Sequence, residues 1–221
     1  IRAAEATLVV SPVEQELLRE VVPEARVFIL SNIHELAPGN ADYGARKDLY
    51  FVGGYQHPPN VDAACWFVEE IWPLVHARLP GVRFHLIGSK APDEVAALGA
   101  AEGVKFHGFV ETLEPFLDQC RLSVAPLRYG AGVKGKVNQA MAHGQPVVAT
   151  SAAVEGIHAE HGKDVMVADE ATAFADAVVQ VYEDATLWQT LADNGLANVR
   201  AHFSKDAAKA NIQTLLQGLR D

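Results

Sequence analysis

Short apolar runs alternate with helical patterns through most of the chain. Each run is bounded by glycine or proline and is followed by apolar residues at helical spacing. Strands separated by single helices are typical of the α/β class with a parallel, doubly wound sheet. Asn60 is expected to cap the helix after the first strand, and Pro73 to kink or shorten that helix. The expected strands are 49–52, 82–87, 104–107, 122–125, 147–149 and 164–167.

The N-terminal stretch carries a shorter version of the same pattern. An apolar run at 7–10 predicts a strand, and Ser11 is a favourable N-cap for the helix that follows. Pro23 ends this helix, and 27–30 predicts a second strand. Residues 31–46 shift to Asn, Pro, Gly and Ala with little periodicity, which indicates a linker or a domain boundary.

The C-terminal part, from about residue 170 to 219, is expected to be helical. Asp184 and Gly195 predict breaks, and Ser204 predicts a helix cap. This helical cluster is too long for a single crossover between strands. It is therefore expected either to wrap around the edge of the sheet or to reach another lobe.

The composition allows a full hydrophobic core, since the chain has 221 residues and 49% of them are apolar. A formal net charge of −10 argues against sequence-independent nucleic-acid binding, although it leaves room for a local cationic pocket. Cys65 and Cys120 lie far apart in apolar settings and are expected to be buried free thiols. No Cys/His spacing typical of a structural zinc site occurs, and no apolar run approaches the roughly 20 residues of a membrane span.

The stretch after the run at 122–125 carries the clearest chemical signal. A loop with Gly130 and Gly132 leads into a helical pattern that begins with Lys134 and Lys136. A strand, a glycine loop and a helix in this order place a helix N-terminus and two ammonium groups at the carboxyl end of a strand, where a phosphate is favoured. Cations at a helix N-terminus oppose the helix dipole, and a bound diphosphate would offset this cost. The alternative is a pair of solvated surface lysines.

Three other strand ends carry glycine, at Gly53–Gly54, Gly88 and Gly108. Glycine there allows a ligand to approach the backbone, or it simply serves a turn with positive φ. Together with the glycine loop, these ends favour one shared cleft. None of these three strand ends continues into GxGxxG with a following acidic residue, so a nicotinamide dinucleotide is not favoured. Val137 follows Lys136 where a Walker motif requires Ser or Thr, so a P-loop NTPase is not expected.

Two polar residues allow two interpretations each. Gln139 follows Lys136 on nearly the same helical face and either binds a ribose or faces solvent. Glu155 follows a strand end and either caps the turn at Ile157 or binds sugar hydroxyls. The nine histidines are scattered without an HxxxH or HExxH pair, and structural or surface roles are expected for them.

Several segments, taken in order, resemble a known family. They are LYFVGGYQHPPNVDA, FHLIGS, VKFHGFVETLEPFLDQCRLSVAPL, and APLRYGAGVKGKVNQAMAHGQPVVAT followed by EGI. This series, which covers roughly 49–203, resembles the C-terminal half of retaining GT-B glycosyltransferases of the group 1 (GT4-type) class. The resemblance implies that 46–221 is a Rossmann-like nucleotide-sugar-binding domain with a C-terminal helical cluster, and that 1–45 is a remnant of the N-terminal lobe and hinge. The chain starts at Ile1 without a visible signal peptide and is expected to be part of a longer, cytoplasmic protein.

The resemblance also implies where a donor would bind. The nucleobase would lie near Phe109 and Val110, the diphosphate near Gly54 and the start of the lysine-bearing helix, and the ribose at the second glutamate of the family's E-x7-E motif. Lys136 and Lys134 would assist departure of the diphosphate and take the place of a metal, and no cofactor is expected. The candidate donor-binding residues are Gly53, Gly54, Gly88, Phe109, Val110, Gly130, Ala131, Gly132, Val137, Gln139 and Glu155.

The sequence departs from the family's pattern at three positions. Gln139 stands where the ribose-binding glutamate is expected, and Ala131 where the first motif glutamate is expected. Gln139 still offers an amide oxygen as an acceptor, but it carries no charge. Tyr55 replaces the basic residue that follows the glycine turn, which leaves neutralisation of the phosphates to Lys134 and Lys136.

The resulting prediction is the donor-binding lobe of a retaining hexosyltransferase in polysaccharide biosynthesis. The missing N-terminal lobe would bind the acceptor, a sugar, lipid or protein, and would provide any peripheral membrane contact. The fragment alone is expected to transfer nothing, and no nucleic acid is expected as a partner. Two alternatives remain open: a GT-B-fold epimerase acting on the nucleotide sugar, and a non-catalytic nucleotide-sugar-binding or scaffold domain, which the loss of both motif glutamates makes credible.

Overall fold

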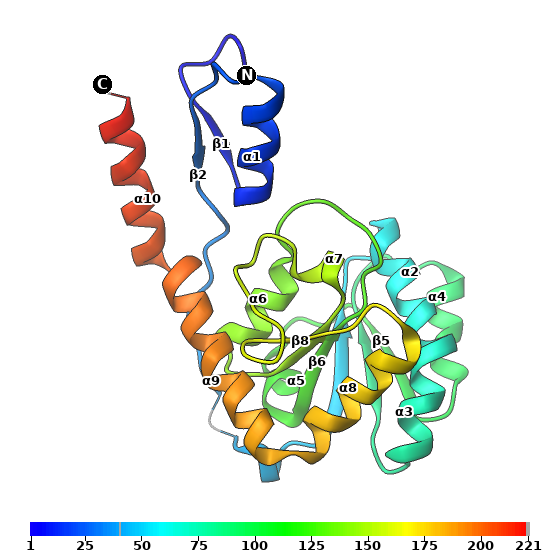
Figure 1. The fold of residues 1–221 in the computed structure, drawn as a ribbon. Coiled ribbons are helices and arrows are strands. Elements are labelled where there is room, and N and C mark those ends of the chain that lie inside the picture. Colours follow the sequence, from blue (N-terminus) through cyan, green and yellow to red (C-terminus); the bar gives the residue numbers. More distant parts are fainter. Residues whose placement is uncertain (40, 220–221) are drawn as a thin grey trace.

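The computed structural model describes residues 1–39 and 41–219, and its main feature is a six-stranded sheet (Figure 1). The strand order is β5-β4-β3-β6-β7-β8, and every neighbouring pair is parallel. The predicted parallel sheet is therefore confirmed. β4 begins later than expected because the N–H of Val82 is donated to the carbonyl of Leu79 in a turn. The strands are β3 (Asp48–Val52), β4 (Phe84–Ile87), β5 (Val104–Gly108), β6 (Cys120–Ala125), β7 (Val147–Ala149) and β8 (Met166–Val167).

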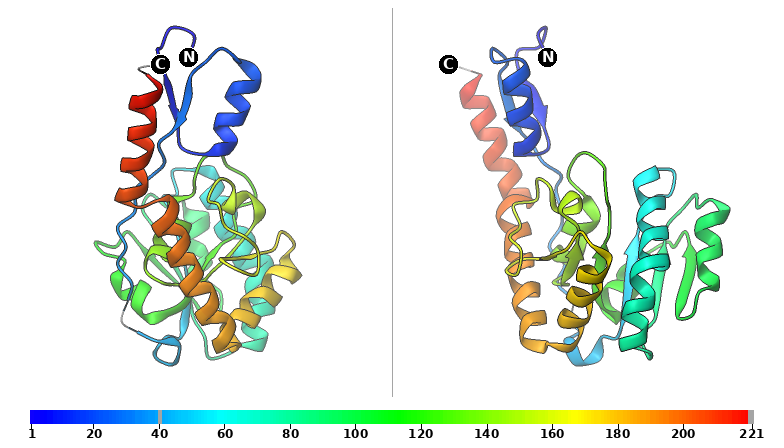
Figure 2. Two further views of the ribbon diagram at one scale, coloured as in Figure 1. Left: turned by 60° about the vertical axis from the view of Figure 1, so that its left-hand side comes forward. Right: turned by 45° about the vertical axis from the view of Figure 1, so that its right-hand side comes forward.

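Helices cover both faces of this sheet, as the views in Figures 1 and 2 show. On one face, α2 (Pro58–Trp66), η2 (Phe67–Ile71) and α3 (Trp72–Arg78) pack with α8 (Ala171–Glu183) around the rings of Phe67, Phe84 and Phe174. On the other face lie α5 (Glu114–Gln119) and α6 (Gly135–Ala142), and α9 (Ala185–His202) packs on α6. The doubly wound arrangement thus follows from strands that are apolar on both sides. Four short helices complete this list: η1 (Tyr43–Ala45), α4 (Asp93–Ala97), η3 (Leu98–Ala100) and α7 (Ser151–Val154).

The N-terminal residues form a separate two-stranded parallel sheet, with β1 (Thr7–Val9), α1 (Pro12–Val21) and β2 (Val27–Ile29). Ser11 caps α1 as predicted, since its hydroxyl accepts the N–H of Glu14 at 3.3 Å and the Glu14 carboxylate accepts the N–H of Ser11 at 3.2 Å. α10 (Lys205–Gly218) runs beside this unit (Figure 2). The C-terminal helices therefore reach back to the N-terminal unit, which was one of the two expected arrangements. The division of the chain at residue 46 stays a prediction.

Two predicted features of the helices are wrong. α9 continues through Gly195, where a Cβ would lie only 3.1 Å from Cγ of Met141. Glycine is used here for close packing of α9 on α6, and the true breaks are at Asp184 and Ser204. Asn60 does not cap α2, whose N-cap is His57, because the two prolines after His57 occupy the first helical positions. Pro73 does interrupt the regular helix, which widens into the π-helical η2 just before it.

The predicted linker runs along α6 and is tied to it. The N–H of Ala37 is donated to the carbonyl of Ala142 at 3.1 Å, and the N–H of Gly39 to that of His143, also at 3.1 Å. These bonds satisfy carbonyl groups that the end of a helix leaves free. Both cysteines are free, and Cys120 is buried, whereas Cys65 is only partly covered, contrary to expectation. No helix within 1–39 or 41–219 is long and apolar enough to cross a membrane.

Candidate functional site

The strand order reverses between β3 and β6, which lie side by side in the middle of the sheet. From β3 the chain proceeds to β4 and β5 on one side, and from β6 it proceeds to β7 and β8 on the other. Gly53 and Gly54 follow β3, and the loop 126–134 follows β6. In open parallel sheets, the carboxyl ends of the two strands at such a switch point form the crevice where ligands bind.

A cavity of about 200 Å³ lies at the carboxyl ends of β3, β4 and β5. Five of the predicted donor-binding residues line it together, which are Gly53, Gly54, Gly88, Phe109 and Val110. The remaining walls are Val52, Ile87, Ser89 and Leu113. Apolar walls interrupted by backbone groups are suited to a flat ring whose edges form hydrogen bonds. Phe109, with 72% of its surface exposed, offers a ring face at the rim.

The three turns around this cavity are packed against each other through their backbones. The N–H of Gly53 is donated to the carbonyl of Ile87 at 2.9 Å, and the N–H of Gly88 to that of Gly108 at 2.8 Å. A Cβ at Gly88 would overlap the carbonyl oxygen of Gly53. Gly88 has φ +149°, so both the space and the backbone conformation require glycine. At this position glycine therefore serves the contact between turns, whether or not a ligand is bound.

Tyr55 does not reach the cavity with its hydroxyl. Its side chain is buried, the hydroxyl has no partner among the described residues, and burial raises its pKa. The backbone N–H of Tyr55 is donated to the carbonyl of Ser89 at 3.0 Å, which ties the first turn to the second. Tyr55 thus has a packing role, and positive charge at the site comes from elsewhere.

Asn60 connects the glycine turn to the start of α6. Its amide nitrogen donates to the carbonyl oxygen of Gly54 at 2.8 Å, and its amide oxygen accepts a hydrogen bond from Nζ of Lys136. The sequence pattern predicts a helix cap at Asn60 and does not reveal this connection. The signal was the pair of prolines before it: they already mark the helix start and leave the Asn60 amide free for another partner.

Lys136 lies in the first turn of α6 and is partly buried. Its Nζ lies 4.3 Å from the centre of the Phe51 ring, in addition to the bond with Asn60. Within the described residues no carboxylate pairs with it, and burial lowers the pKa of Lys136 to about 7. The site therefore holds a cation with neutral partners only, next to free N–H groups of a helix N-terminus. An anion bound there would gain from both.

Lys134 occupies a different environment. It is the N-cap residue of α6, and only 6% of its side chain is exposed. Its Nζ donates to the carbonyl of Gly130 and lies 3.9 Å from Oε2 of Glu155. Burial lowers the pKa of Lys134, while Glu155 acts in the opposite direction. Neither lysine is a solvated surface residue, and the charge of Lys134 already has an internal partner.

The other predicted residues of this stretch are placed apart from one another. Gly130 and Gly132 both have positive φ, Ala131 is exposed in the loop between them, and Val137 is fully buried in the core. Val137 exposes no surface, and a donor contact at this residue stays a prediction. Gln139 is exposed on α6.

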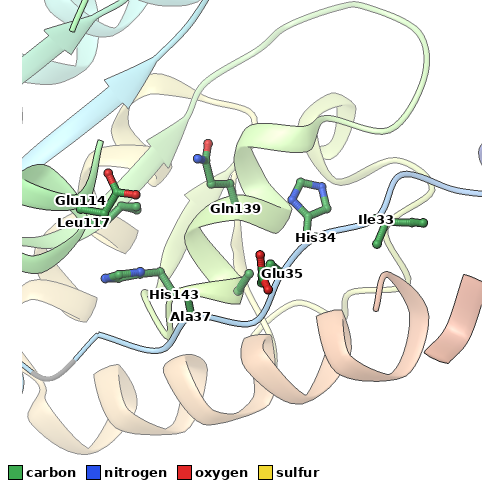
Figure 3. Close-up of a pocket in the computed structure, with 9 residues that line it drawn as sticks. Ile33, His34, Glu35, Ala37, Glu114, Leu117, Gln139 and His143 are labelled. Atoms are coloured by element: carbon green, nitrogen blue, oxygen red, sulfur yellow. The ribbon is translucent and has the colours of Figure 1, made fainter. Parts of the chain in front are cut away.

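Gln139 lines a second cavity, of about 350 Å³, between α5, α6 and the linker. Figure 3 shows the Gln139 side chain between Glu114 of α5 and His34 of the linker. This cavity is separate from the one at the strand ends, since the two share no lining residue. A ribose contact by Gln139 stays a prediction.

The histidines lie in local clusters outside the strand-end cavity. His85 contacts His107 through ring nitrogens 2.8 Å apart and Asp48 at 3.1 Å, and His143 lies 2.8 Å from Asp118. None of the residues that line the strand-end cavity is His, Asp or Glu. Acid–base chemistry at that cavity therefore has no side chain to perform it within its lining.

A reversing parallel sheet with a glycine turn at the switch point defines a Rossmann-like domain, and the partly buried ammonium of Lys136 lies beside that turn. A family model described as Glycosyl transferases group 1 matches residues 46–184, which is more than half of the chain. The chain belongs to this family.

Solved structures of glycosyltransferases share the fold. TarM of S. aureus superposes with a TM-score of 0.83 at 17% identity, over 100% of this chain and 44% of TarM. HepE of Anabaena, in complex with UDP and glucose, gives 0.73 at 16% identity, over 99% of this chain and 63% of HepE. Sucrose-phosphate synthase of Thermosynechococcus elongatus gives 0.74 at 21% identity, over 98% and 58%. The predicted GT-B lobe is confirmed.

Among curated proteins, an uncharacterized 44.6 kDa protein in the cps region of Klebsiella pneumoniae is 22% identical over 173 residues. The match covers 75% of this chain and 45% of that protein. This chain thus spans less than half the length of both this relative and TarM.

Proposed function

We propose that this chain binds the donor of a nucleotide-sugar-dependent glycosyltransferase that transfers a hexose to an acceptor with retention of configuration. The observation that carries the proposal is the environment of Lys136. Its ammonium lies at the switch point, between the glycine turn and the first turn of α6, and its partners are neutral. A diphosphate is the part of a nucleotide sugar that this environment favours.

The same groups would act on the reaction. When the bond between sugar and diphosphate breaks, negative charge develops on the leaving phosphate oxygen. The ammonium of Lys136 and the N–H groups at the start of α6 would stabilise this charge where it forms, which lowers the barrier. Lys134, bound to the Gly130 carbonyl and paired with Glu155, would fix the loop that covers the phosphates.

The strand-end cavity would receive the nucleobase, next to Phe109 and Val110. UDP is the nucleotide we propose, because solved structures with this fold contain it: HepE with UDP-glucose, and TarM with UDP and an α-GlcNAc-glycerol. We further propose that the whole protein is a GT4-type enzyme of polysaccharide biosynthesis in the cytoplasm. Another lobe would bind the acceptor and make any peripheral membrane contact.

Calorimetric titration of the full-length protein with UDP, GDP and ADP, followed by a transfer assay with the matching sugar nucleotides, tests this function. Lys136→Ala is expected to lower turnover by at least about 100-fold, as removal of one charge-stabilising donor does in other enzymes. Lys209→Ala removes an equally charged but exposed side chain on α10 and serves as the matched control. Unchanged turnover in Lys136→Ala would contradict the assignment.

A non-catalytic nucleotide-sugar-binding domain is the second candidate. Ala131 and Gln139 favour it, because the family's two acids are absent at these positions. UDP binding without transfer to any acceptor would support this candidate. An epimerase is not favoured, since the strand-end cavity lacks acid–base side chains.

A further inference from the structure

Asn60 is buried, with 8% of its surface exposed, at a position where α2, the glycine turn and α6 meet. Its side chain packs on Gly53, since a Cβ at Gly53 would lie 3.0 Å from Cβ and Cγ of Asn60. The Asn60 side chain is therefore packed directly against the glycine turn. A buried polar side chain in such a place requires specific partners.

Both ends of the Asn60 amide have a partner of the matching kind. The nitrogen donates to the carbonyl of Gly54, which also accepts the N–H of His57 at 3.2 Å. The oxygen accepts from Lys136. A reversed amide would bring donor against donor at Lys136 and acceptor against acceptor at Gly54, so the two contacts fix its orientation.

Asn60 holds an ammonium group without neutralising it. Lys136 is surrounded by the Phe51 ring of β3, the Asn60 amide of α2 and its own helix. Titratable side chains at the start of α6 are Lys134, which already pairs with Glu155, and His34, whose Nε2 lies 3.9 Å from where a Cβ of Gly135 would be. An aspartate at position 60, identical in shape, would instead supply the missing countercharge from within the protein.

We propose that Asn60 is a positioning residue of the donor site, which holds the Lys136 ammonium against the glycine turn and leaves its charge free for the diphosphate. The inference rests on the proposed function, because it needs a diphosphate as the anion. Asn60 contacts neither the donor nor the reacting atoms in this role. It acts through Lys136 and through the position of Gly54.

The test compares Asn60→Asp and Asn60→Ala with the wild-type full-length protein. The Lys136 ammonium is titrated by NMR with labelled lysine, and UDP affinity is measured by calorimetry from pH 6 to 9. Asn60→Asp is expected to move the titration of Lys136 upward and to weaken UDP binding by about 10-fold or more, since a charge-assisted bond to phosphate is then shared with a carboxylate. Asn60→Ala is expected to weaken binding without raising the Lys136 titration.

Two controls separate this role from a merely structural one. Asn194→Asp makes the same chemical change on the surface of α9 and is expected to leave both measurements unchanged. Asn60→Ala introduced into Lys136→Ala is expected to add little further loss, because the two residues act together. Unfolding temperatures of all variants identify any that fail to fold. In the variants that fold, the titration of Lys136 shows whether Asn60 has the proposed role.

The outcomes distinguish the two levels of the proposal. A wild-type protein that binds none of UDP, GDP and ADP contradicts the proposed function and this inference with it. A wild-type protein that binds UDP, with an Asn60→Asp variant that binds equally well and shows an unshifted Lys136 titration, contradicts only the role of Asn60.

Discussion

The carbonyl oxygen of Gly53 occupies the space that a side chain on Gly88 would need. The turns after β3 and β4 are thereby locked together at the mouth of the strand-end cavity. The shape of this cavity depends on a contact between two backbones rather than on any side chain, so it tolerates no substitution at Gly88.

Gly88→Ala is expected to lower the free energy of unfolding by about 1–3 kcal/mol or more, because the new Cβ both overlaps Gly53 and strains a positive-φ backbone. Thermal and urea unfolding measure the effect. Gly81→Ala is the control, since nothing lies within 4 Å of a Cβ there. Equal stability of the two variants would show that the turns move apart easily.

Gly195→Val is expected to separate α9 from α6 and to cost about 1–3 kcal/mol of stability, as overpacking does elsewhere. Gly195→Ala is expected to be close to neutral, because Met141 can adjust its flexible side chain and alanine favours the helix. Unfolding curves of the two variants test this order. If valine is tolerated as well as alanine, the packing of the two helices is looser than described.

The two lysines are expected to differ when each is replaced by methionine. Lys136→Met removes the uncompensated charge and is expected to abolish transfer with little loss of stability. Lys134→Met breaks the bond to Gly130 and the contact with Glu155, so it is expected to lower the unfolding temperature and to reduce transfer less. Measurements of turnover and of thermal unfolding for both variants check this contrast. If Lys134→Met abolished transfer and Lys136→Met mainly lowered the unfolding temperature, the roles assigned to the two lysines would be exchanged.

Binding of UDP is expected to take up a proton above neutral pH. The pKa of Lys136 is about 7 in the free protein, so its amine is mostly neutral at higher pH, and a bound diphosphate favours the charged form. Affinity should therefore be greatest below pH 7 and fall by up to about tenfold per pH unit above it. Calorimetry in two buffers that differ in protonation enthalpy, neither of them phosphate, measures the uptake, and Lys136→Met should remove this lysine's share of it.

Most of the fold could be predicted because strands and helices follow local patterns. The glycine-bounded apolar runs located the β3, β6 and β7 strands and predicted the parallel sheet. The sequence did not reveal what Gly195 and Asn60 contact. Gly195 has the propensity of a helix breaker, and only the close contact with Met141 shows that it serves the packing of α9 on α6.

The candidate site was predicted in outline and not in detail. Residues that follow strands meet at one edge of a parallel sheet by topology, and this brought Gly53, Gly88 and Phe109 together in one cavity. The difference between Lys134 and Lys136 depends on partners far away in the sequence, Glu155 and Asn60. No local pattern carries that information.

The hydrogen bonds between the linker and the end of α6 connect the N-terminal unit to the helix that carries Lys136. The linker joins the N-terminal unit to the sheet, and it grips α6 at Ala142 and His143, at the opposite end from Lys136. A helix of 8 residues is only about 12 Å long and is stiff along its axis. A displacement of residues 37–39 would therefore be expected to shift α6 along its axis, and Lys136 with it. We therefore expect the position of the N-terminal unit to affect how tightly the proposed site holds a diphosphate.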